Sequence, residues 1–175
     1  MSHSHAPPPA PTTARLGCDI GLLLIRVVVG LTMAGHGTQK LFGWFNGPGL
    51  DATAQGFAAY GYEHEQPMAL LAALTETVGG LGLALGLLTP LAAAGIIGIM
   101  INAIATRWAG AFFLPTGVEF EIVLLAVAAG LALTGPGRLA VDHLLPVVRF
   151  HRLSYGVGAV VLGVAAGLVV VLAFR

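Results

Sequence analysis

Six polar side chains interrupt or border long apolar stretches, and they are the residues of this chain whose types could do chemistry. In chain order they are Arg26, His36, Lys40, Glu76, Asn102 and Glu121. An ionised side chain at the centre of a bilayer costs on the order of 3 kcal/mol on insertion scales, so a charge there needs a function or a partner. Buried carboxylates and histidines can accept and release protons. The six form a proposed polar site, within which catalytic residues stay unassigned.

The spacing of these residues supports two interpretations. If the first and second apolar stretches are antiparallel neighbours, Arg26 and Glu76 lie about 6 Å apart along the helices, an offset that long side chains can bridge. The site is then either a polar pocket that binds a head group, a quinone or a proton, or a structural ion pair between Arg26 and Glu76, completed by Asn102 and backbone carbonyls.

The remaining members of the set lie nearer the ends of the apolar stretches. For His36, Lys40 and Glu121, the alternative to a binding role is a side chain that reaches the membrane surface and is solvated there. Glu119 precedes Glu121 by two positions, so the two carboxylates face different directions on a helix and do not form a catalytic pair.

Composition places these residues in a membrane protein. Of the 175 residues, 57% are hydrophobic and 9% are charged, whereas roughly a quarter are charged in an ordinary soluble domain. The formal net charge is zero, so no basic surface suggests a nucleic-acid partner. Cys18 is the single cysteine, which excludes an internal disulfide and a two-cysteine redox relay.

The apolar stretches predict an all-α integral membrane bundle, because about 20 apolar residues are needed to cross a bilayer as a helix. The predicted spans are 19–41, 68–88, 91–108, 118–134 and 154–174. The joint Thr89-Pro90 is so short that the second and third spans form a helical hairpin.

The connection over residues 42–67 is predicted to lie on the membrane surface. It contains a short helix starting near Asp51. Aromatic side chains that favour the membrane interface surround it: Trp44, Phe45, Phe57, Tyr60 and Tyr62.

Three segments are predicted along the chain. Residues 1–15 form a disordered Pro-rich tail, 16–145 the bundle, and 146–175 a charged linker with an additional transmembrane helix. The charged stretch 138–152 is expected in water or among head groups. In the last span, Ala159, Gly163 and Gly167 recur every four residues, a pattern that favours close helix packing, although these small residues could also simply dilute the span.

The distribution of Lys and Arg predicts the orientation. With the N-terminus in the cytoplasm, the basic residues of the inner side are Arg15, Arg138, Arg149 and Arg152, and those of the outer side are Lys40, Arg107 and Arg175. The slight excess inside favours a cytoplasmic N-terminus and an extracytoplasmic C-terminus.

No cofactor signature is present. His36 is the only histidine associated with a span, whereas a b-type haem would need two, and no flavin, iron-sulfur or metal spacing is seen. The glycines between Gly80 and Gly86 lie inside a predicted helix with no preceding strand, so they indicate packing and not a phosphate loop.

Polar and glycine-containing motifs follow one another along the chain: Arg26, HGTQKLFG at 36–43, Glu76 with Gly79-Gly80, GLLTP at 86–90 and GPGRLAVD at 135–142. In this order and spacing they resemble the DoxX family over about residues 20–145. The resemblance implies a four-helix bundle in the bacterial cytoplasmic membrane, and the family takes its name from subunits of a thiosulfate:quinone oxidoreductase. The fifth, C-terminal span departs from this pattern and is expected to serve docking or assembly.

Three functions follow as expectations. The first is a membrane subunit of a quinone-linked oxidoreductase, which needs another protein as its electron donor. The second is a non-catalytic adaptor that organises soluble redox or stress enzymes through loop 42–67, loop 136–153 and the small-residue face of the last span. The third is a small-solute carrier. The expected partners are membrane lipid and, for the first two functions, other protein subunits or a soluble redox enzyme.

Overall fold

The computed structural model describes residues 12–113, 115, 117–145 and 151–175, and its regular structure over these residues is entirely helical. The α-helices are α1 (Thr12–Phe42), α2 (Gly49–Ala59), α3 (Glu65–Leu85), α4 (Thr89–Arg107), α5 (Glu119–Thr134) and α6 (Leu153–Phe174), with short 3₁₀ turns η1 (Trp44–Asn46) and η2 (Val141–Leu144). Of the tail predicted over residues 1–15, residues 1–11 lie outside the described part, and α1 begins at Thr12.

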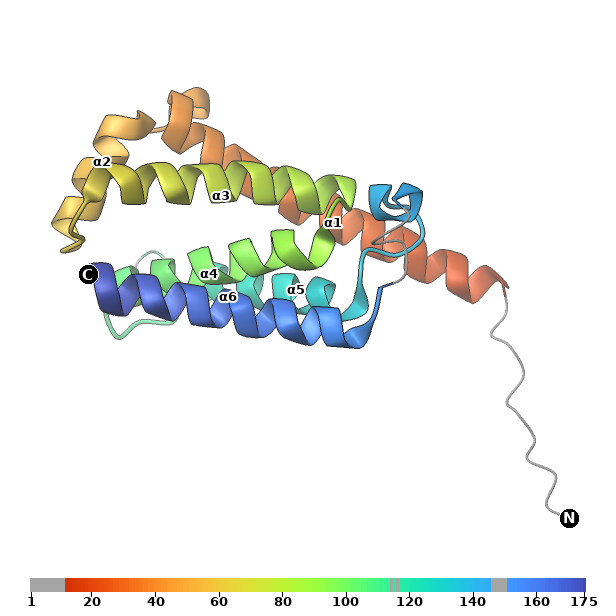
Figure 1. Ribbon diagram of the computed structural model, residues 1–175. Coiled ribbons are helices and arrows are strands. Elements are labelled where there is room, and N and C mark those ends of the chain that lie inside the picture. The colour runs from red at the N-terminus through yellow and green to blue at the C-terminus, as the bar shows by residue number, and fades with distance from the viewer. Residues whose placement is uncertain (1–11, 114, 116, 146–150) are drawn as a thin grey trace, which may run out of the picture.

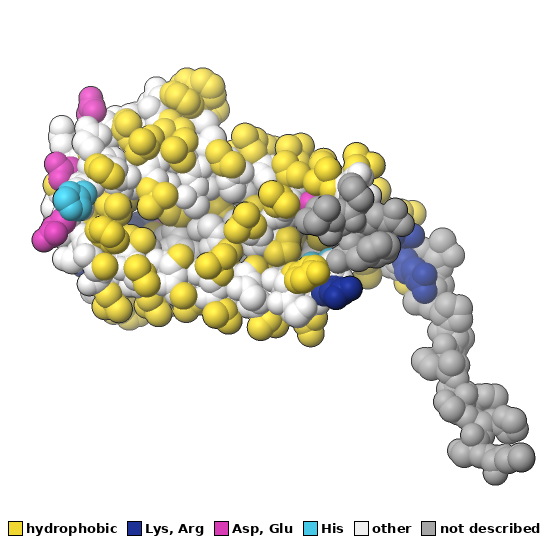
Figure 2. Space-filling view, in the orientation of Figure 1, with side chains coloured by type: hydrophobic (Ala, Val, Ile, Leu, Met, Phe, Trp, Pro, Cys, Tyr) yellow, Lys and Arg dark blue, Asp and Glu magenta, His cyan; other side chains and the backbone are white. Residues whose placement is uncertain are grey.

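Four of the described helices are long and apolar enough to cross a membrane: α1, α3, α4 and α6. α5 has 16 residues and is about 24 Å long, shorter than a bilayer core of about 30 Å, yet it packs against both α4 and α6. Large apolar side chains such as Val28, Val78 and Leu172 point outward, and Figure 2 shows hydrophobic side chains over most of the visible face. The predicted membrane helical bundle is confirmed.

The helices run side by side as two layers that meet through α4. α1 packs mainly on α3, α3 continues into the hairpin with α4, and α4 packs on α5 and α6. In Figure 1, α3 lies above α4 and α6, and the short α2 covers the end of the bundle at which the C-terminus lies. The hairpin turns at Gly86, whose φ of 67° is the left-handed conformation that favours glycine.

Small residues allow the close contacts within each layer. Gly30 of α1 faces the backbone of Gly80 and Ala84 in α3, so that a Cβ at Gly30 would overlap backbone atoms. In α6, Gly163 and Gly167 lie against Ile97, Gly98 and Ile101 of α4. The close packing predicted for the small-residue stripe is confirmed, and its partner is α4 of the same chain, so this face is not free to dock another protein.

Replacing Gly30 by alanine is expected to destabilise the bundle by about 1–3 kcal/mol, since overpacking against backbone cannot be relieved by a rotamer change. Gly35 is the matched control on the same helix, because a Cβ there meets nothing within 4 Å. Gly35→Ala should be neutral or slightly stabilising through helix propensity. Thermal unfolding of the purified variants in detergent checks both, and equal midpoints for the two variants would contradict the α1–α3 contact.

At the end of the bundle away from α2, one buried carboxylate holds the hairpin. Asp142 accepts hydrogen bonds from the backbone N–H of Leu88 at 2.7 Å and of Thr89 at 3.0 Å, where α4 begins. The expectation that the whole stretch 138–152 sits in water or among head groups is therefore wrong for Asp142. Its carboxylate is buried because it supplies acceptors for N–H groups that have no partner within the first turn of a helix.

The two ends of the bundle differ in charge. Asp51 and Glu65 lie at the end that α2 covers, whereas Arg15, Arg138 and Arg152 lie near the opposite end. Figure 2 shows acidic side chains at the first end and basic ones at the second. By the positive-inside rule, the end with Arg15, Arg138 and Arg152 would face the cytoplasm. The cytoplasmic N-terminus and extracytoplasmic C-terminus stay a prediction.

Candidate functional site

A cavity of about 620 Å³ lies at the α2 end of the bundle, and each of the six described helices contributes to its wall. Most of the wall is apolar, with Met33, Leu71, Ile99 and Met100 among its residues. Its volume falls within the roughly 300–1,000 Å³ that is usual for sites of small molecules. Five of the six residues proposed from the sequence line it: His36, Lys40, Glu76, Asn102 and Glu121.

The first polar group of the wall is an ion pair between Lys40, near the end of α1, and Glu76, in the middle of α3. Gly37 brings the two helices together there, because it lies against Ala73 and Thr77. Glu76 is buried, while the Lys40 side chain is 27% exposed. The carboxylate therefore depends on Lys40 for its charge partner, whereas the Lys40 side chain is partly accessible to its surroundings.

The second polar group is the ion pair between Arg107, the last residue of α4, and Glu121, in the first turn of α5. His36 lies against the first turn of α5, since its ring meets that of Phe120 edge-on with centroids 6.0 Å apart. The Nδ1 atom of His36 is 3.2 Å from Oε1 of Gln39. Sequence reasoning missed Arg107, although its position at a helix end shortly before two glutamates is a usable signal.

The third polar group joins Tyr62 to Asn102. The Asn102 amide donates to the backbone oxygens of Gly98 at 2.9 Å and Gly167 at 3.1 Å, and its Oδ1 accepts from the Tyr62 hydroxyl at 2.9 Å. Burial raises the pKa of Tyr62, partly offset by the charge of Arg175, so the phenol stays a protonated donor at neutral pH.

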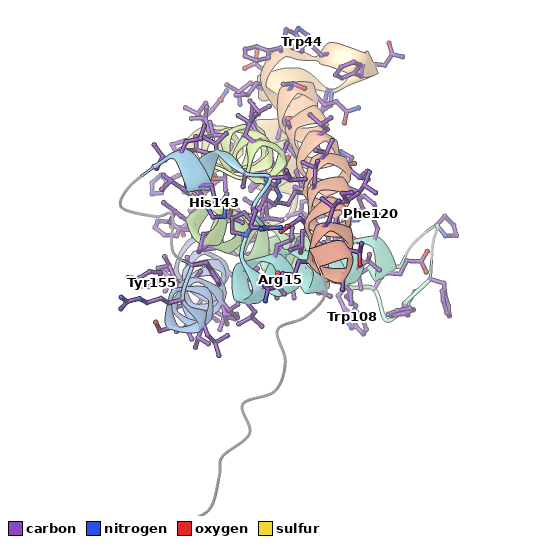
Figure 3. All side chains as sticks on the ribbon, turned by 90° about the vertical axis from the view of Figure 1, so that its right-hand side faces the viewer. Arg15, Trp44, Trp108, Phe120, His143 and Tyr155 are labelled. Atoms are coloured by element: carbon purple, nitrogen blue, oxygen red, sulfur yellow. The ribbon has the colours of Figure 1, made fainter. Side chains whose placement is uncertain are left out.

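The aromatic residues of loop 42–67 divide between surface and core. Trp44, Phe45 and Tyr60 are exposed, as predicted, and the end-on view of Figure 3 shows Trp44 at the outer edge of the bundle. The prediction is wrong for Tyr62, which is buried against Phe57, with ring centroids 5.0 Å apart, and points into the cavity wall.

Arg26 does not belong to the cavity, and the predicted Arg26–Glu76 ion pair is wrong. Gly37, near the end of α1, lies beside Ala73 and Thr77, which are well inside α3, so the two antiparallel helices are shifted along each other. Because of this shift, Arg26 lies beside Gly86, just past the end of α3, and not beside Glu76. Lys40 takes the place at Glu76 that was assigned to Arg26.

Arg26 instead belongs to the opposite end of the bundle, where it is fully buried. Its Nη2 donates to the backbone oxygen of Leu139 at 2.5 Å, and the negative charge of Asp142 acts on the guanidinium. These contacts tie α1 to the segment that follows α5. Arg26 therefore lies apart from the other five residues predicted from the sequence, which line the cavity.

The cavity can hold a flat apolar molecule and offer it hydrogen-bond donors, acceptors and two opposite-charge pairs. The titratable side chains of its wall include His36, Lys40, Glu76 and Glu121. Among the described residues, no three His, Cys, Asp or Glu side chains lie close enough together to hold a metal ion.

Comparisons with known proteins agree with this architecture. The DoxX family model matches residues 21–109. A Bacillus subtilis (strain 168) protein named "Putative oxidoreductase CatD" is 34% identical over 124 residues, which cover 71% of this chain and 86% of that protein. No solved structure matches the chain. The chain belongs to the DoxX family of membrane proteins.

Proposed function

We propose that the cavity binds the ring of a membrane quinone and that the chain is the membrane subunit of a quinone-linked oxidoreductase. The observation that carries the proposal is the combination of a largely apolar chamber of about 620 Å³ with the Lys40–Glu76 ion pair in its wall. The name of the Bacillus subtilis relative points to the same class of reaction.

The polar groups of the wall suit the proton part of such a reaction. Interconversion of a quinone and a quinol moves two protons together with two electrons. Glu76 and His36 can exchange protons with a ring held between them, and Lys40 places a positive charge beside a ring oxygen. The electrons travel between the ring and a separate redox protein, which is the expected partner of this chain.

The position of the cavity suits a ligand that arrives through lipid. Leu71 and Tyr60 both line the cavity and are about half exposed. The route that we propose from the membrane into the cavity therefore passes between α2 and α3. A quinone could keep its isoprenoid tail in the membrane while its ring enters between these helices.

The proposal is tested by mass spectrometry of small molecules extracted from gently purified protein. Wild type should retain a quinone. Glu76→Gln removes the ion-pair partner that positions Lys40 in the cavity wall, so this variant should retain at least tenfold less. Glu65→Gln is the matched control, because Glu65 is exposed at the start of the same helix and should leave retention unchanged.

Absence of quinone from all three preparations would contradict the proposal. Stable co-purification of a soluble enzyme, unaffected by Glu76→Gln, would then support the adaptor function, and solute flux in vesicles would support a carrier. All variants are first compared by size-exclusion chromatography, so that a loss of quinone is scored only for folded protein.

A further inference from the structure

One carboxylate oxygen in the cavity wall has no hydrogen-bond partner among the described residues. Glu121 is 4% exposed and lines the cavity. Its Oε1 atom pairs with Arg107, whereas its Oε2 atom is buried and accepts no hydrogen bond from residues 12–113, 115, 117–145 or 151–175, the part of the chain that the structure describes. A buried polar atom without a partner costs free energy, and such an atom beside a cavity indicates a ligand that completes it.

The ion pair defines what that ligand must supply. A carboxylate paired with an arginine is ionised, and an ionised carboxylate only accepts hydrogen bonds. The missing group is therefore a donor, an O–H or N–H, that reaches Oε2 from inside the cavity. A ligand oxygen that carries no hydrogen would face a negative charge there and be repelled.

The surroundings of Glu121 indicate an aromatic donor. Phe120 and Leu124, on the same helix, also line the cavity, and the ring of His36 meets Phe120 edge-on. Apolar and aromatic side chains thus flank the free oxygen, as expected around the edge of a bound ring. A phenolic hydroxyl combines a flat apolar body with the donor that Oε2 lacks.

We infer, on the basis of the proposed function, that the cavity takes the quinone in its reduced form, with a phenolic hydroxyl of the quinol donating to Oε2 of Glu121. The oxidised quinone presents only carbonyl oxygens, which are acceptors and cannot make this contact. Glu121 thereby distinguishes the two redox forms of one ring. Arg107, whose side chain is 42% exposed, connects the same carboxylate to the surface.

The test compares the two redox forms directly on the full chain in phosphatidylcholine nanodiscs. Isothermal titration calorimetry under anaerobic conditions gives the dissociation constants of ubiquinol-1 and ubiquinone-1. Wild type should bind the quinol at least tenfold more tightly, as a hydrogen bond to a charged acceptor implies. Glu121→Gln should reduce this preference below threefold, because a neutral amide accepts more weakly and can also donate.

Glu119→Gln is the control, because Glu119 lies two residues earlier on α5 and is not among the residues that line the cavity. It should keep the wild-type preference. Equal affinity of wild type for both redox forms, as expected if only water meets Oε2, would overturn the inference while leaving the proposed function intact. Failure of wild type to bind either form would instead contradict the proposed function. The wild-type ratio decides the matter even if Glu121→Gln does not fold.

Discussion

Replacement of Asp142 by alanine is expected to destabilise the protein by about 3–5 kcal/mol, the cost of breaking a buried charged network by removing one partner. The carboxylate is buried and accepts from the N–H groups of Leu88 and Thr89, and it is the negative charge that acts on the buried Arg26. Its loss leaves two N–H groups at the start of α4 and one cation without their partner. Denaturant or thermal unfolding in a fixed detergent measures the effect.

Two further variants make this result specific. His143→Ala removes the neighbouring exposed side chain and should change stability by less than about 0.5 kcal/mol. Asp142→Asn keeps one acceptor but not the charge, so its stability should fall between those of Asp142→Ala and His143→Ala. If Asp142→Ala is as stable as His143→Ala, Asp142 does not hold the hairpin.

The fold could be predicted because membrane insertion imposes a simple rule on the sequence. A helix that crosses lipid needs about 20 apolar residues, and Gly, Pro and polar residues mark where it ends. α5 ends at Thr134 and α6 at Phe174, where the apolar stretches were predicted to end. The beginning of α1 was not predicted, because the helix starts at Thr12, before the apolar stretch, and the residues of its first turns are not marked by hydrophobicity.

The convergence of five site residues could be predicted for a related reason. In antiparallel helices of similar length, a polar residue near a known end lies at a known depth, which places Lys40, Glu76 and Glu121 on one side of the membrane. The partner of each residue could not be predicted in the same way. Whether Glu76 meets Arg26 or Lys40 depends on the sliding of α1 along α3, which is fixed by contacts of Gly30 and Gly37 with the facing backbone.

The positions of side chains outside the spans were still harder to predict. Tyr62 follows a surface helix and has the composition of an interfacial aromatic, but the turn before α3 directs its ring inward to Asn102. Asp142 lies in a charged stretch, and only the fold places it beside the start of α4. In both cases the side chain satisfies a polar group that belongs to a distant part of the chain, which no local pattern reveals.

The Lys40–Glu76 pair should respond unequally to removal of its two partners. Lys40→Met leaves the Glu76 carboxylate buried without a counter-charge, which is expected to destabilise the protein by about 3–5 kcal/mol. Glu76→Gln leaves Lys40 without its partner, but the Lys40 side chain is 27% exposed and can reach water. This variant is therefore expected to lose only about 1 kcal/mol of stability. Unfolding of both single variants in mixed micelles measures the difference.

The double variant Lys40→Met with Glu76→Leu separates charge from packing. Replacing a buried ion pair by apolar residues of similar size is often neutral or stabilising, so the double variant should be more stable than Lys40→Met alone and should bind no quinone. A variant that is stable but binds no quinone would mean that the ion pair serves ligand binding and is not needed for the stability of the fold. If instead Lys40→Met is no less stable than Glu76→Gln, the carboxylate is not held as a buried charge, and its proposed role beside the quinone ring must be abandoned.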